Sequence, residues 1–436
     1  MKRTLFHITA ICLLSAMTAH AQQTLHLSQA ECRRMALAHN EDLQCADNAV
    51  RQTEIDKTVA FAAYLPKIDG TVSGTYLSDM DMMGMKLQMR GMYMAGITLT
   101  QPLYAGGKIR ASNRLAEIGR QCAEEERRLT RMQVVADADN AYWSYIAVLW
   151  KVKMLKAYKH QMDTLYNQAQ ISLTAGMSTD NDLLRIETKR SEISYQLQKA
   201  LNGANLCRLS LCYVLGCPLE SCITPADTAI VLSAPKHLNE SITSRPELHL
   251  LQKQVEAAEQ QVKVARADIL PQIGLSGGYM YYGNVKMKGI TTDAQGSPLS
   301  YTQKFDDGLA FVMASVSIPL FHWGEGLKKI KRAKIDVQNK KLDLQKNTRL
   351  LSIEVHRAIQ NVMDSHMLVQ TAALGCQQAN ENLRNMRNRY ESGMCNLTDL
   401  MDAQIQWQQA QSNSIEAQTQ CKINETEYLQ VTGKLE

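Results

Sequence analysis

The 436-residue sequence is poor in aromatic side chains, which make up 6% of it, and has only five phenylalanines. After its first 21 residues it has no apolar run of 18 residues, which excludes a membrane-spanning helix there. It lacks the phosphate-binding loop, HExxH and GxSxG motifs, and its histidines are scattered without metal-ligand spacing. We therefore expect neither an enzyme, nor a cofactor, nor a metal site.

No strong excess of charge is present. The sequence has 48 basic and 43 acidic side chains, and no basic stripe is interleaved with aromatic residues. Nucleic-acid binding is therefore not expected.

The first residues are typical of a secretory signal. Lys2 and Arg3 precede an apolar run, Leu5–Met17, which is too short to cross a bilayer, and Ala19-His20-Ala21 fits a cleavage site. We predict a signal peptide over residues 1–21. Cys12 lies inside the apolar run, so a lipid anchor is not predicted.

Cysteines recur without a CxxC motif. Cys207, Cys212, Cys217 and Cys222 are spaced by five, which places neighbours about 140° apart on a helix, on no common face. We interpret them as small packing residues. A disulfide near Cys217 and Cys222 stays open, because exported proteins meet an oxidising compartment.

Two long stretches contain no proline, Lys108–Thr174 and Glu325–Glu391. Their apolar residues recur at steps of three and four, which predicts helices of about 100 Å. Gly176 and Gly393 end them, and a second helical pattern returns after each glycine. Helices of this length need a coiled-coil-like partner, so the sequence predicts two long helical hairpins.

Strand patterns precede both long helices. Met94–Gly107 and Phe311–Gly324 alternate apolar with small or polar residues, and Pro102 and Pro319 end the alternation. One face is apolar in both copies, as shown by Ala95, Ile97, Leu99, Val312, Ala314, Val316 and Ile318.

The similarity of the two copies indicates an internal duplication. Gly107 and Gly324 are 217 positions apart, as are Gly176 and Gly393, whereas Leu65 and Leu270 are 205 apart. The loop of the second hairpin is therefore expected to be 12 residues longer.

The predicted organisation follows from these boundaries. The first repeat covers 22–217, with a helix over Ser28–Ala63, strands at about 67–78 and 91–103, and a helical hairpin over 108–215. An irregular linker covers 218–240. The second repeat covers 241–436, with a helix over Pro246–Asp268, strands at about 272–283 and 305–321, and a hairpin over 325–432.

Four strands cannot close a barrel, and an open sheet would leave unpaired edges in lipid. Several chains must each contribute four strands, and a twelve-stranded barrel from three chains would have an open lumen. We predict an α+β membrane protein of this kind.

At this point the sequence resembles the TolC family of outer-membrane efflux channels. The resemblance is carried by the paired Leu-Pro strand starts, Pro102-Leu103, Pro319-Leu320, the long helices, and the tips AGMSTDNDLL and YESGMCNLTDLMDA. It implies a homotrimer with a 12-stranded β-barrel in the outer membrane and an α-helical tunnel across the periplasm. It also implies a periplasmic adaptor and an inner-membrane pump of the RND or ABC type as partners.

The helix turns hold the candidate site residues. Thr179-x-x-Asp182 and Asn396-x-x-Asp399 fit helix caps, and Asp402 lies on the same face as Asp399. The resemblance implies that Asp399 and Asp402 form acidic rings at the periplasmic mouth, that Tyr390 helps to close it, and that Asp182 joins a salt bridge between hairpins. Cys395 stands where drug-efflux relatives carry the arginine partner, so Arg185 is a candidate replacement. The implied adaptor-docking tips are Gly176, Met177, Gly393 and Met394.

These patterns favour a passive export duct for small molecules. A duct for secreted proteins shares the same fold. Seven methionines in the first strand loop keep export of Cu(I) or Ag(I) open as a further alternative: Met80, Met82, Met83, Met85, Met89, Met92 and Met94. A periplasmic coiled-coil adaptor is the alternative of another class, but it has no need of a lipid-facing strand face.

Overall fold

The computed structural model describes residues 24–78, 80–82, 85–88, 91–176, 178–227, 238–292 and 297–435. The chain divides into two compact units. Unit 1 comprises Met1–Asn48, Glu125–His249 and Gln345–Glu436, and unit 2 comprises Ala49–Glu124 and Leu250–Leu344. The predicted signal peptide lies outside the described residues.

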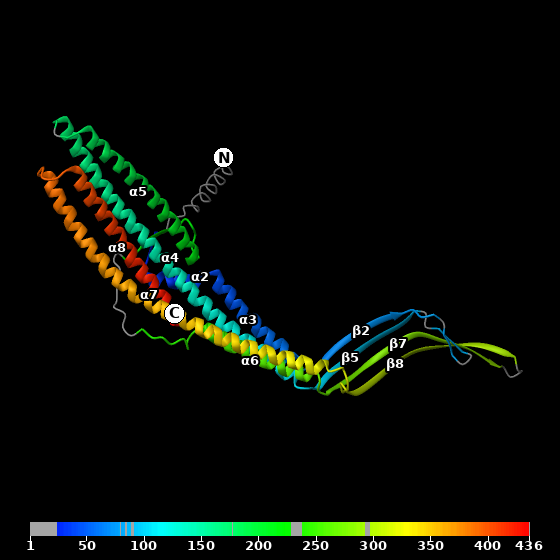
Figure 1. The fold of residues 1–436 in the computed structure, drawn as a ribbon. Helices are drawn as coiled ribbons and strands as arrows, with labels where there is room; N and C mark the ends of the chain where they lie inside the picture. The colour runs from blue at the N-terminus through cyan, green and yellow to red at the C-terminus, as the bar shows by residue number, and fades with distance from the viewer. Residues whose placement is uncertain are drawn as a thin grey trace, which may run out of the picture. The chain divides into compact units, whose positions relative to one another are not determined.

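Both predicted helical hairpins are present (Figure 1). α4 (Lys108–Thr174) and α5 (Asp180–Leu215) form the first, and α7 (Glu325–Glu391) and α8 (Leu397–Val431) form the second. α4 and α7 have 67 residues each, because no proline interrupts their hydrogen-bond ladders. None of the helices in the described part of the chain is long and apolar enough to cross a membrane.

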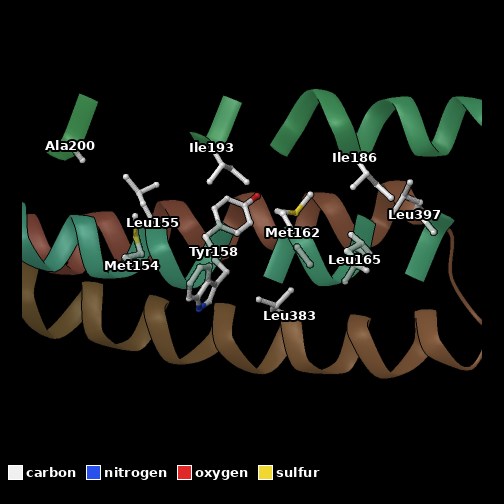
Figure 2. Close-up of a cluster of buried hydrophobic side chains, with 14 of the residues drawn as sticks. Met154, Leu155, Tyr158, Met162, Leu165, Ile186, Ile193, Ala200, Leu383 and Leu397 are labelled. Atoms are coloured by element: carbon white, nitrogen blue, oxygen red, sulfur yellow. The ribbon is translucent and has the colours of Figure 1, made fainter. Parts of the chain in front are cut away.

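The two hairpins share one hydrophobic core in unit 1 (Figure 2). Tyr158 and Met162 of α4 are fully buried, and Ile193 of α5 packs against the same cluster. α7 contributes Leu383, and the ring of Trp407 on α8 meets Tyr158 edge-on with centroids 6.0 Å apart. Because all four helices bury side chains together, neither hairpin has to be stable alone.

A buried carboxylate ties further elements of unit 1 to this bundle. Asp139 of α4 is 1% exposed and accepts two hydrogen bonds from the guanidinium of Arg33, at 2.8 and 2.6 Å. Thr426 of α8 donates a third at 2.9 Å. The bidentate pair neutralises the buried carboxylate, and together with Thr426 it links three helices.

The predicted helix Ser28–Ala63 is wrong in one respect: it is two helices, α2 (Gln29–His39) and α3 (Glu41–Ala62). Asn40 between them is extended, with φ −67° and ψ 129°, and its side-chain oxygen accepts from the Asp42 backbone N–H at 2.9 Å. An asparagine side chain can replace a helical hydrogen bond to a nearby backbone N–H. Here the Asn40 side chain caps the start of α3, and the extended Asn40 backbone ends α2. Ser28 and Glu31 form a capping box at the start of α2.

The linker predicted over 218–240 is not wholly irregular. β6 (Cys222–Pro225) lies within it and pairs in parallel with β1 (Thr24–Leu27). This pairing joins the start of the described chain to the junction between the repeats. Residues 228–237 of the linker lie outside the described part. Cys217 and Cys222 are both free thiols.

Unit 2 holds an antiparallel sheet whose main strands run in the order β2 (Lys67–Thr75), β5 (Met92–Ala105), β7 (Gln272–Thr292) and β8 (Pro298–Ser317). Figure 1 shows the four strands side by side. Two short strands, β3 (Met80–Met82) and β4 (Met85–Gln88), extend the first strand hairpin, and β4 pairs with the far part of β7. α6 (Pro246–Ala267) precedes β7.

The bounds predicted for the second pair of strands, 272–283 and 305–321, are wrong. β7 continues to Thr292 and β8 begins at Pro298, so most of the extra length lies in the strands rather than in a loop. Asn284 lies just beyond the predicted strand end and has φ +63°, and the register of β7 with β8 shifts there, between Tyr282 and Val285. Its backbone N–H donates to Asp306 at 2.6 Å and its side-chain amide to the Gly91 carbonyl at 3.0 Å, so pairing resumes beyond it.

The register gives the sheet one apolar face and one mixed face on which small and polar residues predominate. Ile97 of β5 lies opposite Tyr279 of β7, and Tyr279 lies opposite Ala310 of β8. Directly opposed residues point to the same face, so this face continues across all four strands. It carries Ile68, Val72, Ala95, Ile97, Leu99, Ile273, Leu275, Tyr279, Tyr281, Ala310, Val312, Ala314 and Val316.

The apolar face is exposed, with Val72 at 85% and Val312 at 82% of their full accessibility. The opposite face carries small and polar residues such as Thr71, Thr98 and Ser315. A sheet that leaves its apolar face uncovered in the single chain needs an apolar environment outside it.

The backbone repeats the duplication seen in the sequence. Gly216 and Gly433, 217 residues apart, end α5 and follow α8 with φ +64° and +71°. A Cβ at Gly216 would lie 2.9 Å from the His39 Cβ, and a Cβ at Gly433 would lie 2.5 Å from the Ser244 carbonyl oxygen. His39 and Ser244 are 205 residues apart, which is the offset of the two strand starts. Each hairpin thus ends against the equivalent point of its own repeat.

Candidate functional site

The two helix turns of unit 1 hold the predicted site residues. The first turn joins α4 to α5 through Gly176, which has φ +72°, and the second joins α7 to α8 through Gly393, which has φ +71°. A Cβ at either glycine would meet no atom of the described chain within 4 Å. The positive φ selects glycine, while the open space leaves both tips free for an external contact.

Met394 beside the second tip is 71% exposed, and its backbone N–H donates to the Arg389 carbonyl at 2.7 Å. Its counterpart in the first turn, Met177, lies outside the described residues. So does much of the methionine-rich strand loop, since the side chains of residues 81–90 are not described.

The cap roles predicted for the two turns are confirmed. Thr179 accepts from the Asp182 backbone N–H at 3.2 Å, and the Thr179 hydroxyl donates to the Asp182 carboxylate at 2.8 Å. Asn396 accepts from the Asp399 backbone N–H at 2.8 Å. The Asp182 carboxylate is therefore engaged in its own turn, whereas the Asp399 carboxylate is exposed at the start of α8.

Arg185 links the two hairpins. Its guanidinium Nη1 donates to the Thr398 hydroxyl at 3.0 Å, from the second turn of α5 to the first turn of α8. The predicted replacement of the missing bridge thus reaches the neighbour of Asp399 rather than the Asp182 carboxylate. The positive charge of Arg185 therefore lies at the first turn of α8, next to Asp399.

Tyr390 lies at the end of α7, half-buried against the shared core. Burial raises the pKa of its hydroxyl, and the nearby Asp182 carboxylate raises it further. Tyr390 also lines a cavity of about 240 Å³, together with His160, Arg387 and Gln404.

Asp402 lies one helical turn beyond Asp399, and both side chains are exposed. Two exposed acids on one helix face fit the predicted acidic site, although a single chain shows only one pair.

Sequence reasoning missed a further contact between the hairpins, in which Gln408 of α8 donates to the Gln196 side chain of α5 at 2.8 Å. It also missed a contact within the first hairpin. Arg190 of α5 pairs with Asp163 of α4, and its guanidinium lies 5.0 Å from the centre of the Tyr166 ring. Uncharged glutamines at scattered positions give no sequence signal for such a pairing.

Comparison with known proteins agrees with this arrangement. Residues 32–204 and 237–434 match the family described as outer membrane efflux protein. The chain is 22% identical over 407 residues to a probable outer membrane lipoprotein, SilC of Salmonella typhimurium, covering 91% of this chain and 84% of SilC. It is 24% identical over 343 residues to the outer membrane efflux protein BepC of Brucella suis, covering 75% and 68%.

The fold is also that of a solved channel. The crystal structure of CusC, described in terms of folding and transmembrane channel formation, matches with a TM-score of 0.79 at 16% identity over 95% of each chain. At this identity the likeness shows the fold alone, but the family match spans both repeats. The chain therefore belongs to the outer membrane efflux protein family, the TolC-like family that the sequence resembles.

Proposed function

We propose that the chain is the exit duct of a tripartite efflux system, a passive channel for small molecules from the periplasm through the outer membrane. The apolar sheet face carries this proposal. It runs across all four main strands and is exposed, and its reverse is polar, as a wall between lipid and a water-filled lumen requires.

Closure of the lumen requires more than one chain. β2 and β8 each pair with one neighbour in the described sheet, so each leaves an edge without a partner there. Unpaired edges are not tolerated in lipid. A homotrimer would join β8 of one protomer to β2 of the next, and twelve strands would close the barrel.

The helix turns are the proposed periplasmic end. Gly176 and Gly393, with their neighbours Met177 and Met394, form the proposed docking surface for the adaptor, since both glycines are open to solvent. The inner-membrane pump, of RND or ABC type, supplies the energy, because a family of channel proteins has no reaction of its own.

The proposed gate consists of Asp182, Tyr390 and Arg185, with the acids Asp399 and Asp402. The hydrogen bond from Arg185 to Thr398 joins one hairpin to the other. Opening of the mouth would require the hairpins to separate, which would break this bond.

A fractionation experiment separates this function from the adaptor alternative. A duct held by lipid-facing strands stays in the outer membrane through an alkaline carbonate wash, and a peripheral coiled-coil adaptor leaves with the wash. The purified chain should also conduct ions in a planar bilayer. Release by the wash together with absence of conductance would refute the duct.

A further inference from the structure

A cluster of metal-binding side chains lies between α7 and α8 in unit 1, away from the turns. His366 projects from α7, and Cys421 and Glu425 project from α8 with the i, i+4 spacing that places both on one helix face. One ligand atom from each residue lies within 4.8 Å of the others. Cys421 is fully buried, and the side chains of His366 and Glu425 are 15% and 27% exposed.

Two buried polar atoms of the cluster face each other without a hydrogen bond. His366 Nε2 and Glu425 Oε1 lie 3.3 Å apart, which is an ion pair only when His366 is protonated, and both atoms are shielded from solvent and make no hydrogen bond in the described structure. Buried polar atoms are nearly always satisfied, so two such atoms converging on one thiol indicate a missing bound group.

The surrounding charges are compatible with a cation. Lys422 carries the nearest positive charge, but it pairs with the other carboxylate oxygen of Glu425, Oε2, at 2.8 Å, which leaves Oε1 directed to the cluster. Cys421 is fully buried, so a thiolate at this position would need a positive charge beside it, which a bound metal ion would supply.

The donor set selects the class of ion. Thiolate, imidazole and carboxylate are the three protein ligands of Zn²⁺, with bonds of about 2.0–2.3 Å. Ligand atoms around such an ion lie roughly 3–4 Å apart, so closing the cluster requires only small side-chain rotations. Mg²⁺ and Ca²⁺ prefer oxygen ligands and do not match this set.

We propose that His366, Cys421 and Glu425 bind a borderline-soft divalent cation of the Zn²⁺ type, with water as the fourth ligand. The ion joins α7 to α8 about 37 Å from the turn, since each ligand lies some 25 residues from the hairpin end. Its place in the middle of the hairpin makes it a structural clamp, separate from the proposed gate and docking surface.

Cobalt spectroscopy tests the site on the full chain purified in detergent under reducing conditions. Co²⁺ should bind with the near-ultraviolet charge-transfer band of a cobalt thiolate, and one equivalent of Zn²⁺ per chain should displace it. Cys421→Ser should remove the band, and His366→Gln should weaken Zn²⁺ binding at least about tenfold, because even the loss of a neighbouring partner has this effect in known sites.

Matched controls exclude other thiols and histidines. Cys376→Ser removes a half-buried thiol of α7 that is outside the cluster, and His356→Gln removes an exposed histidine of the same helix. Both should bind Co²⁺ and Zn²⁺ like the wild type, and Zn²⁺ should raise the melting temperature of the wild type and both controls but not of Cys421→Ser. Equal binding and equal thermal shifts in all variants, or a cobalt spectrum without a thiolate band, would overturn the proposal.

Discussion

Arg185 of the first hairpin donates to the Thr398 hydroxyl of the second at 3.0 Å. The acceptor lies between Leu397, which is buried in the shared core, and Asp399, which belongs to the proposed acidic site. This exposed hydrogen bond therefore holds Arg185 to the segment of α8 that joins the shared core to the candidate gate.

Removal of this link should favour the open mouth. Arg185→Met keeps the aliphatic stem and deletes the donors, and Thr398→Val deletes the acceptor. Loss of one hydrogen bond costs about 1 kcal/mol, or roughly a fivefold shift between closed and open states. Single-channel recordings should show a higher mean conductance in both variants.

Lys189→Met is the control, because Lys189 pairs with Glu192 of its own helix and does not reach the other hairpin. The gate assignment of Arg185 is wrong if its variant conducts like Lys189→Met. The double variant should open no further than either single variant, since both changes break one contact.

The acidic pair predicts a pore that prefers cations. Threefold symmetry would bring six carboxylates from Asp399 and Asp402 around one axis, and crowded negative charge at a constriction attracts cations. Multivalent cations should therefore block current from the periplasmic side. Asp399→Asn with Asp402→Asn should abolish the block and lower the selectivity for cations.

Asp402→Asn is the cleaner single change, since Asp402 lies outside the helix cap, whereas Asp399 belongs to it through its backbone N–H. Wild-type block and selectivity in the double variant would show that the two acids are ordinary surface residues.

The proposed docking of the adaptor at the helix turns can be tested at Gly393. Gly393→Trp adds bulk in open space, so it should block the adaptor and abolish export without loss of assembly. Gly393→Ala carries the same strain from the positive φ, about 1–2 kcal/mol, but little bulk. Dye efflux from loaded cells should fail with tryptophan and largely survive with alanine.

Cross-linking of the adaptor in cells provides the second measurement for this position. Equal export by the tryptophan and alanine variants would place the docking surface elsewhere, whereas equal failure would assign the effect to backbone strain.

Parts of this structure follow from the sequence for clear physical reasons. The 67-residue helices were predictable because proline is absent and glycine falls where each chain reverses. The two sheet faces were predictable because strand residues alternate with period two. The internal duplication shows which residues of the two repeats are equivalent, for example Gly176 and Gly393.

Other parts depend on distant contacts that local patterns do not encode. Asn40 ends a helix within an otherwise helical pattern, and Asn284 lies at a bulge beyond which the two strands continue to pair. The pairing of β1 with β6 joins two four-residue segments some 200 positions apart. His366 and Cys421 come from different helices, so the metal cluster has no spacing motif.

If the apolar face of the sheet contacts lipid, arginine should be tolerated differently at neighbouring residues of β8. Val312 lies on the apolar face and Met313 on the opposite face, at nearly the same depth. Val312→Arg should cost about 2–4 kcal/mol near the middle of the bilayer. Met313→Arg should be milder, since its side chain would point into water.

Folding yield into detergent-resistant protein measures this difference. Equal yields for the two arginine variants would contradict the assignment of the apolar face to lipid.

The mass of the detergent-extracted particle tests the central claim most directly, because a four-stranded sheet with two open edges can form a duct only with other copies. Light scattering with correction for bound detergent should give three times the mass of the processed chain, and the same fraction should conduct in planar bilayers. A monodisperse monomer that conducts would contradict the account.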